Sequence, residues 1–104
     1  MTTYNKVVRD NIPEIIQKDG HTCNIKTLPD EKFLIEIEKK LSEEVIEYQN
    51  DKNPEELADI LEVIYRIAKL QGISKEELEK IQIKKSKERG SFEKNIFLID
   101  TSEN

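Results

Sequence analysis

Apolar residues recur along the middle of the chain at spacings of three and four, which is the period of an amphipathic helix. Between Asp30 and Asn50 they form one narrow stripe: Leu34, Ile37, Leu41, Val45 and Tyr48. The stripe predicts a long helix, and Asp30 is a suitable residue to cap its start. A polar stretch, residues 50–53, follows and predicts a turn.

A second helix is predicted over residues 54–71, where Asn53 and Pro54 form a typical helix start. Its apolar face is broad: Leu57, Ile60, Leu61, Val63, Ile64, Ile67 and Ala68. On a helical wheel Glu56 falls inside this apolar arc and Asp59 lies at its edge, whereas Glu55 and Glu62 point to solvent. A glutamate that faces a core needs a partner.

The flanking segments predict two further helices and a small β ribbon. Pro13 fits the first turn of a short helix over 13–19, which ends before Gly20. Ser74 and Glu77 form a capping box that opens a helix to about Glu88. We expect Leu78 and Ile81 to lie on the buried side of this helix.

Residues 22–28 and 92–99 alternate loosely between apolar and polar positions, which favours two short strands. The expected fold is therefore mainly all-α, a four-helix bundle with a possible small β ribbon. At 104 residues we expect a single domain over 1–104.

Charge and cysteine content exclude several classes of protein. With 17 basic and 22 acidic residues the net charge is -5, which argues against binding to nucleic-acid polymers or to membranes. No apolar run approaches the roughly 20 residues of a membrane span. The lone Cys23 excludes an internal disulfide and a cysteine zinc site, so we expect a cytoplasmic protein.

Two acidic motifs carry the candidate chemistry. Glu44 and Glu47 are three residues apart on the first long helix, and so are Glu56 and Asp59 on the second. Residues at this spacing share one side of a helix, so antiparallel packing would bring four carboxylates together. At roughly 5 Å each like-charge pair costs about 3 kcal/mol. Such a cluster favours a hard cation: Mg²⁺, Mn²⁺ or Ca²⁺.

A solvated helix face is the simpler explanation for acidic residues in a chain rich in glutamate. Glu43, Glu55 and Glu62 fit that explanation. Glu44 and Glu56 do not, because they border or enter the apolar stripes. Helix capping is a second alternative for Glu56, and it is compatible with metal binding.

Basic residues flank the helices at both ends of the sequence: Lys6, Arg9, Lys84, Lys85, Lys87 and Arg89. Phosphates held by a metal on one side need positive charge on the other. For Lys84 and Lys85 a favourable interaction with the helix dipole is the better explanation. A structural ion pair is an equal alternative for Arg9. Neither His21 nor Cys23 has a sequence context that indicates catalysis.

The motif EEVIE at residues 43–47, followed by EELADILEVI at 55–64, resembles the MazG-like superfamily of all-α nucleotide pyrophosphohydrolases. Their signature is EExxE on one helix and ExxD on the next. The flanks YNKVVRDNIPEII at 4–16 and KSKERGSFEKNIFL at 85–98 also look like those of a small MazG-like subgroup. The resemblance therefore covers nearly the whole chain.

The resemblance implies Mg²⁺-dependent cleavage, with Mn²⁺ as a possible substitute, between the α- and β-phosphates of a nucleoside triphosphate, releasing a monophosphate and pyrophosphate. It implies four metal ligands: Glu44, Glu47, Glu56 and Asp59. Glu43 and Glu44 would be catalytic, with Glu43 positioning the attacking water or contacting a further metal. Four basic residues would bind substrate: Lys6, Arg9, Lys87 and Arg89. It also implies a homodimer or homotetramer.

One departure from the family pattern is the short link of eight residues between Glu47 and Glu56. A tight turn there puts in doubt the loop that often helps to recognise the base. Two other functions stay open: a phosphoribosyl-ATP pyrophosphohydrolase of histidine biosynthesis, which would share the acids and scaffold, and a non-catalytic helical interaction module.

Overall fold

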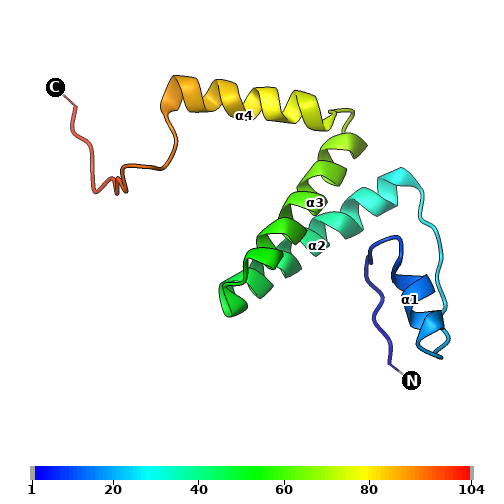
Figure 1. Cartoon of the computed structure of the whole chain (residues 1–104). Helices are drawn as coiled ribbons and strands as arrows, with labels where there is room; N and C mark the ends of the chain where they lie inside the picture. The colour runs from blue at the N-terminus through cyan, green and yellow to red at the C-terminus, as the bar shows by residue number, and fades with distance from the viewer. Residues whose placement is uncertain (1, 104) are drawn as a thin grey trace.

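The computed structural model describes residues 2–103, which form four helices and no strand. The helices are α1 (Ile12–Lys18), α2 (Asp30–Asp51), α3 (Pro54–Leu70) and α4 (Lys75–Arg89). The all-α class is thus confirmed, but the β ribbon is wrong. Residues 22–28 and 92–99 lie at opposite ends of the molecule (Figure 1), and an alternating segment without a hydrogen-bonding partner does not become a strand.

α2 and α3 form an antiparallel hairpin across a tight turn at Lys52 and Asn53 (Figure 1). Lys52 has a left-handed backbone with φ of 56°, and its N–H donates to the carbonyl of Tyr48 at 2.7 Å. The Asn53 side chain accepts a hydrogen bond from the Glu55 N–H at 3.0 Å, as expected of a cap. The other predicted cap is wrong, since Pro29 precedes the helix and Asp30 is its first residue.

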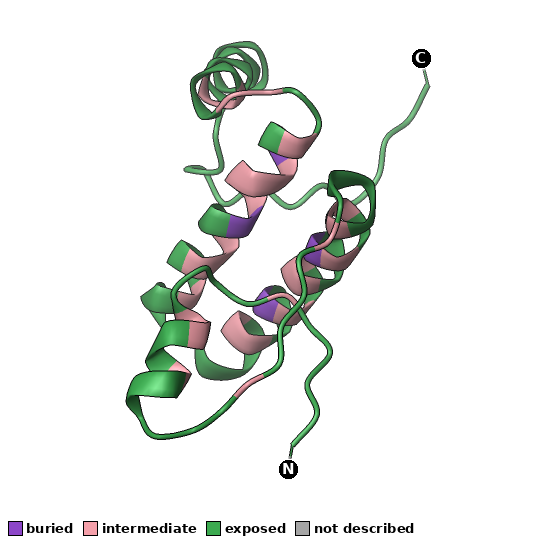
Figure 2. Ribbon diagram, turned by 90° about the vertical axis from the view of Figure 1, so that its right-hand side faces the viewer, coloured by how far each residue is buried: buried purple, intermediate pink, exposed green. Residues whose placement is uncertain are grey.

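The core is small and lies between α2 and α3 (Figure 2). Its buried apolar side chains are Ile37 on α2 with Val63 and Ala68 on α3. Leu57 and Leu61, although apolar, are 46% and 50% exposed. The predicted face of α3 is therefore wider than the surface that α2 covers.

α4 begins with the predicted capping box, in which the Ser74 hydroxyl accepts from the Glu77 N–H at 3.1 Å. It contacts α3 but buries none of its own residues. The expected burial of Ile81 is wrong, because this side chain is 48% exposed. A capping box is a local signal and fixes where a helix starts, but it does not determine what the helix packs against.

The molecule is elongated, because α4 and the segment after it extend away from the hairpin (Figure 1). The radius of gyration is 18.5 Å and the extents are 66 × 32 × 22 Å. A compact domain of this length has a radius of gyration near 13 Å. The last segment leaves its apolar side chains in solvent, with Phe92 and Phe97 100% and 87% exposed.

Among residues 2–103, none of the helices combines the length and the apolar character needed to cross a membrane.

Candidate metal centre

The acidic cluster lies at the turn end of the α2–α3 hairpin. We use this name for Glu43, Glu44, Glu47, Glu56 and Asp59. The first three residues lie in the last three turns of α2 and the other two in the first turns of α3, so the tight turn places them opposite each other. Carboxylate oxygens of Glu44, Glu56 and Asp59 lie within 4.8 Å of one another, and so do those of Glu43, Glu44 and Glu47.

Glu44 is the most buried member of the cluster, at 5% exposure. Its Oε1 lies 3.1 Å from the Nζ of Lys40, one turn earlier on α2. Its Oε2 is buried and has no hydrogen-bond partner among residues 2–103. A buried carboxylate oxygen without a partner loses its hydration with nothing to replace it, so this position favours a bound cation or an acidic proton.

Glu56 shows the same feature on the opposite helix. Its side chain is half-buried, and its Oε2 is likewise buried without a hydrogen-bond partner in the described part of the chain. Burial raises the pKa of Glu56, and the neighbouring Glu47 and Asp59 raise this pKa further. The acidic cluster thus carries more negative charge than the neighbouring basic side chains neutralise.

Two lysines reach Glu43 from different directions. Lys6 Nζ lies 2.9 Å from its Oε1 and Lys40 Nζ lies 3.5 Å from the same atom. The hydrogen bond from Lys6 is the main cause of a lowered pKa for Glu43, and the same bond raises the pKa of Lys6. Glu43 is therefore held in its ionised form.

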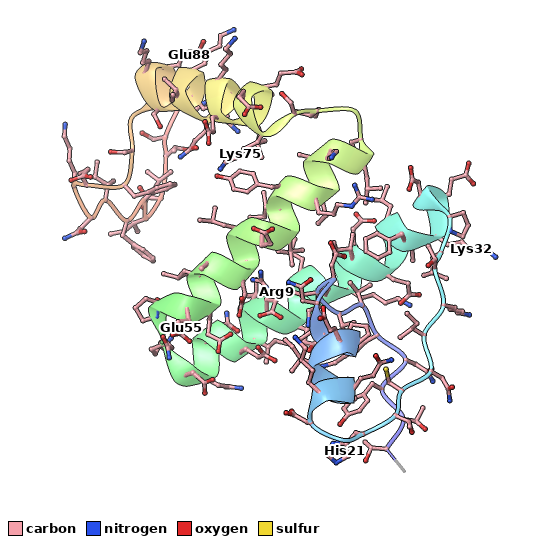
Figure 3. All side chains as sticks on the ribbon, turned by 45° about the vertical axis from the view of Figure 1, so that its right-hand side comes forward. Arg9, His21, Lys32, Glu55, Lys75 and Glu88 are labelled. Atoms are coloured by element: carbon pink, nitrogen blue, oxygen red, sulfur yellow. The ribbon has the colours of Figure 1, made fainter. Side chains whose placement is uncertain are left out.

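Arg9 reaches α3, where its Nη2 lies 2.6 Å from Oδ1 of Asp59 (Figure 3). The structural alternative for Arg9, an ion pair, is therefore observed. Its partner is a member of the acidic cluster, so the observation is equally compatible with a role at the site.

Sequence reasoning missed Lys40, which bridges Glu43 and Glu44 and is only 17% exposed. Lys40 lies three residues before Glu43 and four before Glu44, which is the spacing of ion pairs along a helix. This spacing could have identified Lys40 from the sequence. The exposure of Glu55 and Glu62, by contrast, is as predicted.

Lys87 and Arg89 are not brought to the acidic cluster within one chain. Both lie in the last turn of α4 and are exposed. α4 starts at the end of α3 that is remote from Glu56 and Asp59, and it runs away from the hairpin (Figure 1). Their predicted contact with phosphate stays a prediction.

Comparison with known proteins adds little on function. No protein-family model and no solved structure matches the chain. An uncharacterized protein of Mycolicibacterium smegmatis (strain ATCC 700084 / mc(2)155) is 45% identical over 42 residues. This match covers 40% of the chain and 43% of the relative, so the chain spans less than half the length of the curated protein that it matches.

Proposed function

We propose that this chain is a MazG-like, Mg²⁺-dependent nucleotide pyrophosphohydrolase that cleaves the bond between the α- and β-phosphates. The observation that carries the proposal is Glu44, a carboxylate 5% exposed whose Oε2 has no partner, set among acids of two helices. The resemblance of the acidic motifs and of both flanks supports the same conclusion.

The donor set fits a small divalent cation. Mg²⁺ binds oxygen at 2.0–2.1 Å, so two opposite ligand atoms lie about 4.2 Å apart. The carboxylate oxygens of Glu44, Glu56 and Asp59 lie within 4.8 Å of one another, so small side-chain movements are enough. Glu47, in the group with Glu44, completes the proposed ligands. Carboxylates alone favour Mg²⁺ or Mn²⁺ over softer metals.

A bound metal would supply positive charge that stabilises the phosphoryl oxygens and makes a coordinated water more acidic. Glu43 would then orient the attacking water or contact a further metal. Its lowered pKa suits this role better than that of a proton acceptor, because a weak base takes up a proton poorly near neutral pH. Water would attack the α-phosphorus and lose its proton to solvent, the α–β anhydride bond would break, and a monophosphate and pyrophosphate would leave.

The positive charge for the phosphates would come from Lys6 and Arg9, which already lie at the acidic cluster. Lys87 and Arg89 are further candidates, but only if they arrive from another chain. Such charge-assisted contacts to phosphate are stronger than neutral ones, and the guanidinium group binds phosphate through two parallel hydrogen bonds.

We also propose a homodimer or homotetramer in which a second copy covers the segment after α4. Four apolar side chains there are 74–87% exposed: Ile96, Phe97, Leu98 and Ile99. An exposed apolar patch of this kind usually marks an interaction surface. Sedimentation at two concentrations tests this assembly, since a monomer at both would contradict it.

The test of activity is a pyrophosphate-release screen with Mg²⁺ over canonical nucleotides, modified nucleotides and phosphoribosyl-ATP. We expect release from at least one nucleotide, and its loss in Glu56→Gln and Asp59→Asn. Glu62→Gln is the matched control, because Glu62 is exposed on the same helix.

Selective cleavage of phosphoribosyl-ATP would assign the chain to histidine biosynthesis. No release from any substrate, together with no thermal shift on adding Mg²⁺ or Mn²⁺, would favour the non-catalytic interaction module.

A further inference from the structure

The N-terminal segment, residues 5–9, crosses from one helix of the hairpin to the other. Asn5, with φ of 46°, turns the chain just before Lys6. Lys6 then pairs with Glu43 on α2 at 2.9 Å, and Arg9 pairs with Asp59 on α3 at 2.6 Å. Two cations of one short segment thus neutralise acids on both sides of the acidic cluster.

We propose that this segment is a displaceable strap: Lys6 and Arg9 neutralise Glu43 and Asp59 in the metal-free protein, and a divalent cation at the cluster releases them to bind substrate phosphates. The proposal rests on the metal site of the proposed function but not on the reaction assigned to it.

A metal ion at the cluster competes with Arg9 for the same carboxylate. Asp59 is one of the acids that would hold the cation, and its Oδ1 already accepts from Arg9. A guanidinium bonded to a ligand oxygen lies within a few ångströms of the cation, where two positive charges repel each other. Metal binding and the Arg9 ion pair therefore weaken each other.

The segment is also only loosely attached to the hairpin. Lys6 and Arg9 are 41% and 55% exposed, and exposed ion pairs contribute little to stability. A hollow of about 70 Å³, lined partly by Val7 and Lys39, separates the segment from α2. None of residues 2–9 is buried, so the segment can move away without opening the core.

Lys40 provides the contrast. It pairs with the same Glu43 but sits on α2 and is only 17% exposed, so its ammonium group cannot leave the cluster by a movement of the backbone. A lysine and an arginine on a segment without buried residues can turn to an incoming phosphate, whereas Lys40 is held on α2. The difference assigns the phosphate contact to Lys6 and Arg9.

The experiment starts with the side chain of Arg9. The arginines of this chain are Arg9, Arg66 and Arg89, so their ¹⁵Nε–H signals are assigned by single substitutions. Titration with Mg²⁺ should shift the Arg9 signal toward that of a free guanidinium and leave Arg66 unmoved. Arg66 is the internal control because it lies 4.0 Å from Asp30, away from the acidic cluster.

Binding of Mn²⁺, followed by electron paramagnetic resonance, gives the second readout. Arg9→Gln should bind Mn²⁺ about two- to fivefold more tightly than the wild type, the range that an exposed ion pair allows. Arg66→Gln should bind it with unchanged affinity. With saturating Mg²⁺, Arg9→Gln should bind pyrophosphate more weakly than the wild type. The same substitution should thus strengthen metal binding and weaken pyrophosphate binding.

Two results would overturn the strap. One is Mn²⁺ binding that is unchanged or weaker in Arg9→Gln; the other is an Arg9 signal that does not move while the metal binds. Either result leaves the proposed metal site intact. Absence of Mn²⁺ binding in both the wild type and Arg9→Gln would overturn the strap and the metal site together.

Discussion

At the turn end of the α2–α3 hairpin a carboxylate is buried, whereas beyond the other end phenylalanine side chains lie in solvent. Glu44 is 5% exposed and Phe92 is 100% exposed. Both reverse the usual distribution of charged and apolar groups. At the acidic end a buried carboxylate oxygen of Glu44 has no hydrogen-bond partner among residues 2–103. At the α4 end no residue of the described chain covers the Phe92 ring.

The contrast shows that the two ends are incomplete in different ways. The acidic cluster is assembled within one chain, because the tight turn and the N-terminal segment bring its members together. The α4 end buries nothing of its own. We therefore expect substitutions at the first end to change ligand binding, and substitutions at the second to change association between chains.

The largest effect is expected for Glu44→Gln, which keeps the shape of the side chain but removes its charge. Loss of one ligand should weaken Mn²⁺ binding and Mg²⁺-dependent pyrophosphate release by about a hundredfold or more. This is a larger loss than is usual when a residue that only supports a metal ligand is substituted. Calorimetry and the release assay measure it, with Glu62→Gln as the exposed control. Unaltered Mn²⁺ binding would show that the buried acid is not a ligand.

Ile37→Ala should destabilise the hairpin by about 2–3 kcal/mol, because truncation of a buried isoleucine removes apolar burial and leaves a cavity. Ile35→Ala, on the same helix but 57% exposed, should change the free energy of unfolding by less than about 0.5 kcal/mol. Urea unfolding measures both. Equal losses of stability in the two variants would mean that something other than α3 also covers the Ile35 side of α2.

Phe97→Ser should weaken self-association about tenfold, which corresponds to about 1.4 kcal/mol. The reason is that this ring, 87% exposed in one chain, would be covered in the assembly. Sedimentation equilibrium gives the dissociation constant. Ile25→Ser is the control, since Ile25 is 68% exposed outside the α4 end. Equal changes in both variants would argue that the segment after α4 has no special role.

The smallest effect is expected for Glu56→Gln in metal-free protein, which should melt a few degrees higher at neutral pH. The pKa of Glu56 is raised in the folded chain, so the folded state binds its proton more tightly than the unfolded state does. Stability therefore falls as the pH rises through this raised pKa. The gain from the substitution should be present at neutral pH and shrink in acid.

Thermal melts with a chelator at two pH values measure this gain. Glu55→Gln, next in sequence but exposed, should give none. A lower melting temperature for Glu56→Gln at neutral pH would contradict the view that the cluster carries excess negative charge.

Local signals made much of the fold predictable. The Asn53–Pro54 start of α3 and the Ser74 capping box depend on neighbouring residues alone, and both are confirmed. The helical wheel also predicted that Glu56 turns toward the apolar side, and its Oε2 is buried. Local rules placed the start of α2 one residue late, because they predicted Asp30 as the cap and it is the first residue of the helix.

Long-range contacts could not be predicted in the same way. Arg9 and Asp59 are 50 residues apart, and no period or motif connects them. The segment 92–99 has the alternation of a strand, but its state depends on a partner that the sequence does not identify. Motif spacing thus predicted the acids, while the pairing of Lys6 and Arg9 with them required the structure.

The turn at Lys52 and Asn53 also sets a limit on how this protein can change. Surface turns usually accept insertions. Here one extra residue within the start of α3 would rotate the positions after it by about 100° and carry Glu56 and Asp59 out of register with Glu44. Residues added before Pro54 leave this register unchanged, so the constraint lies within the start of α3, and related chains that keep the cluster should keep the spacing there.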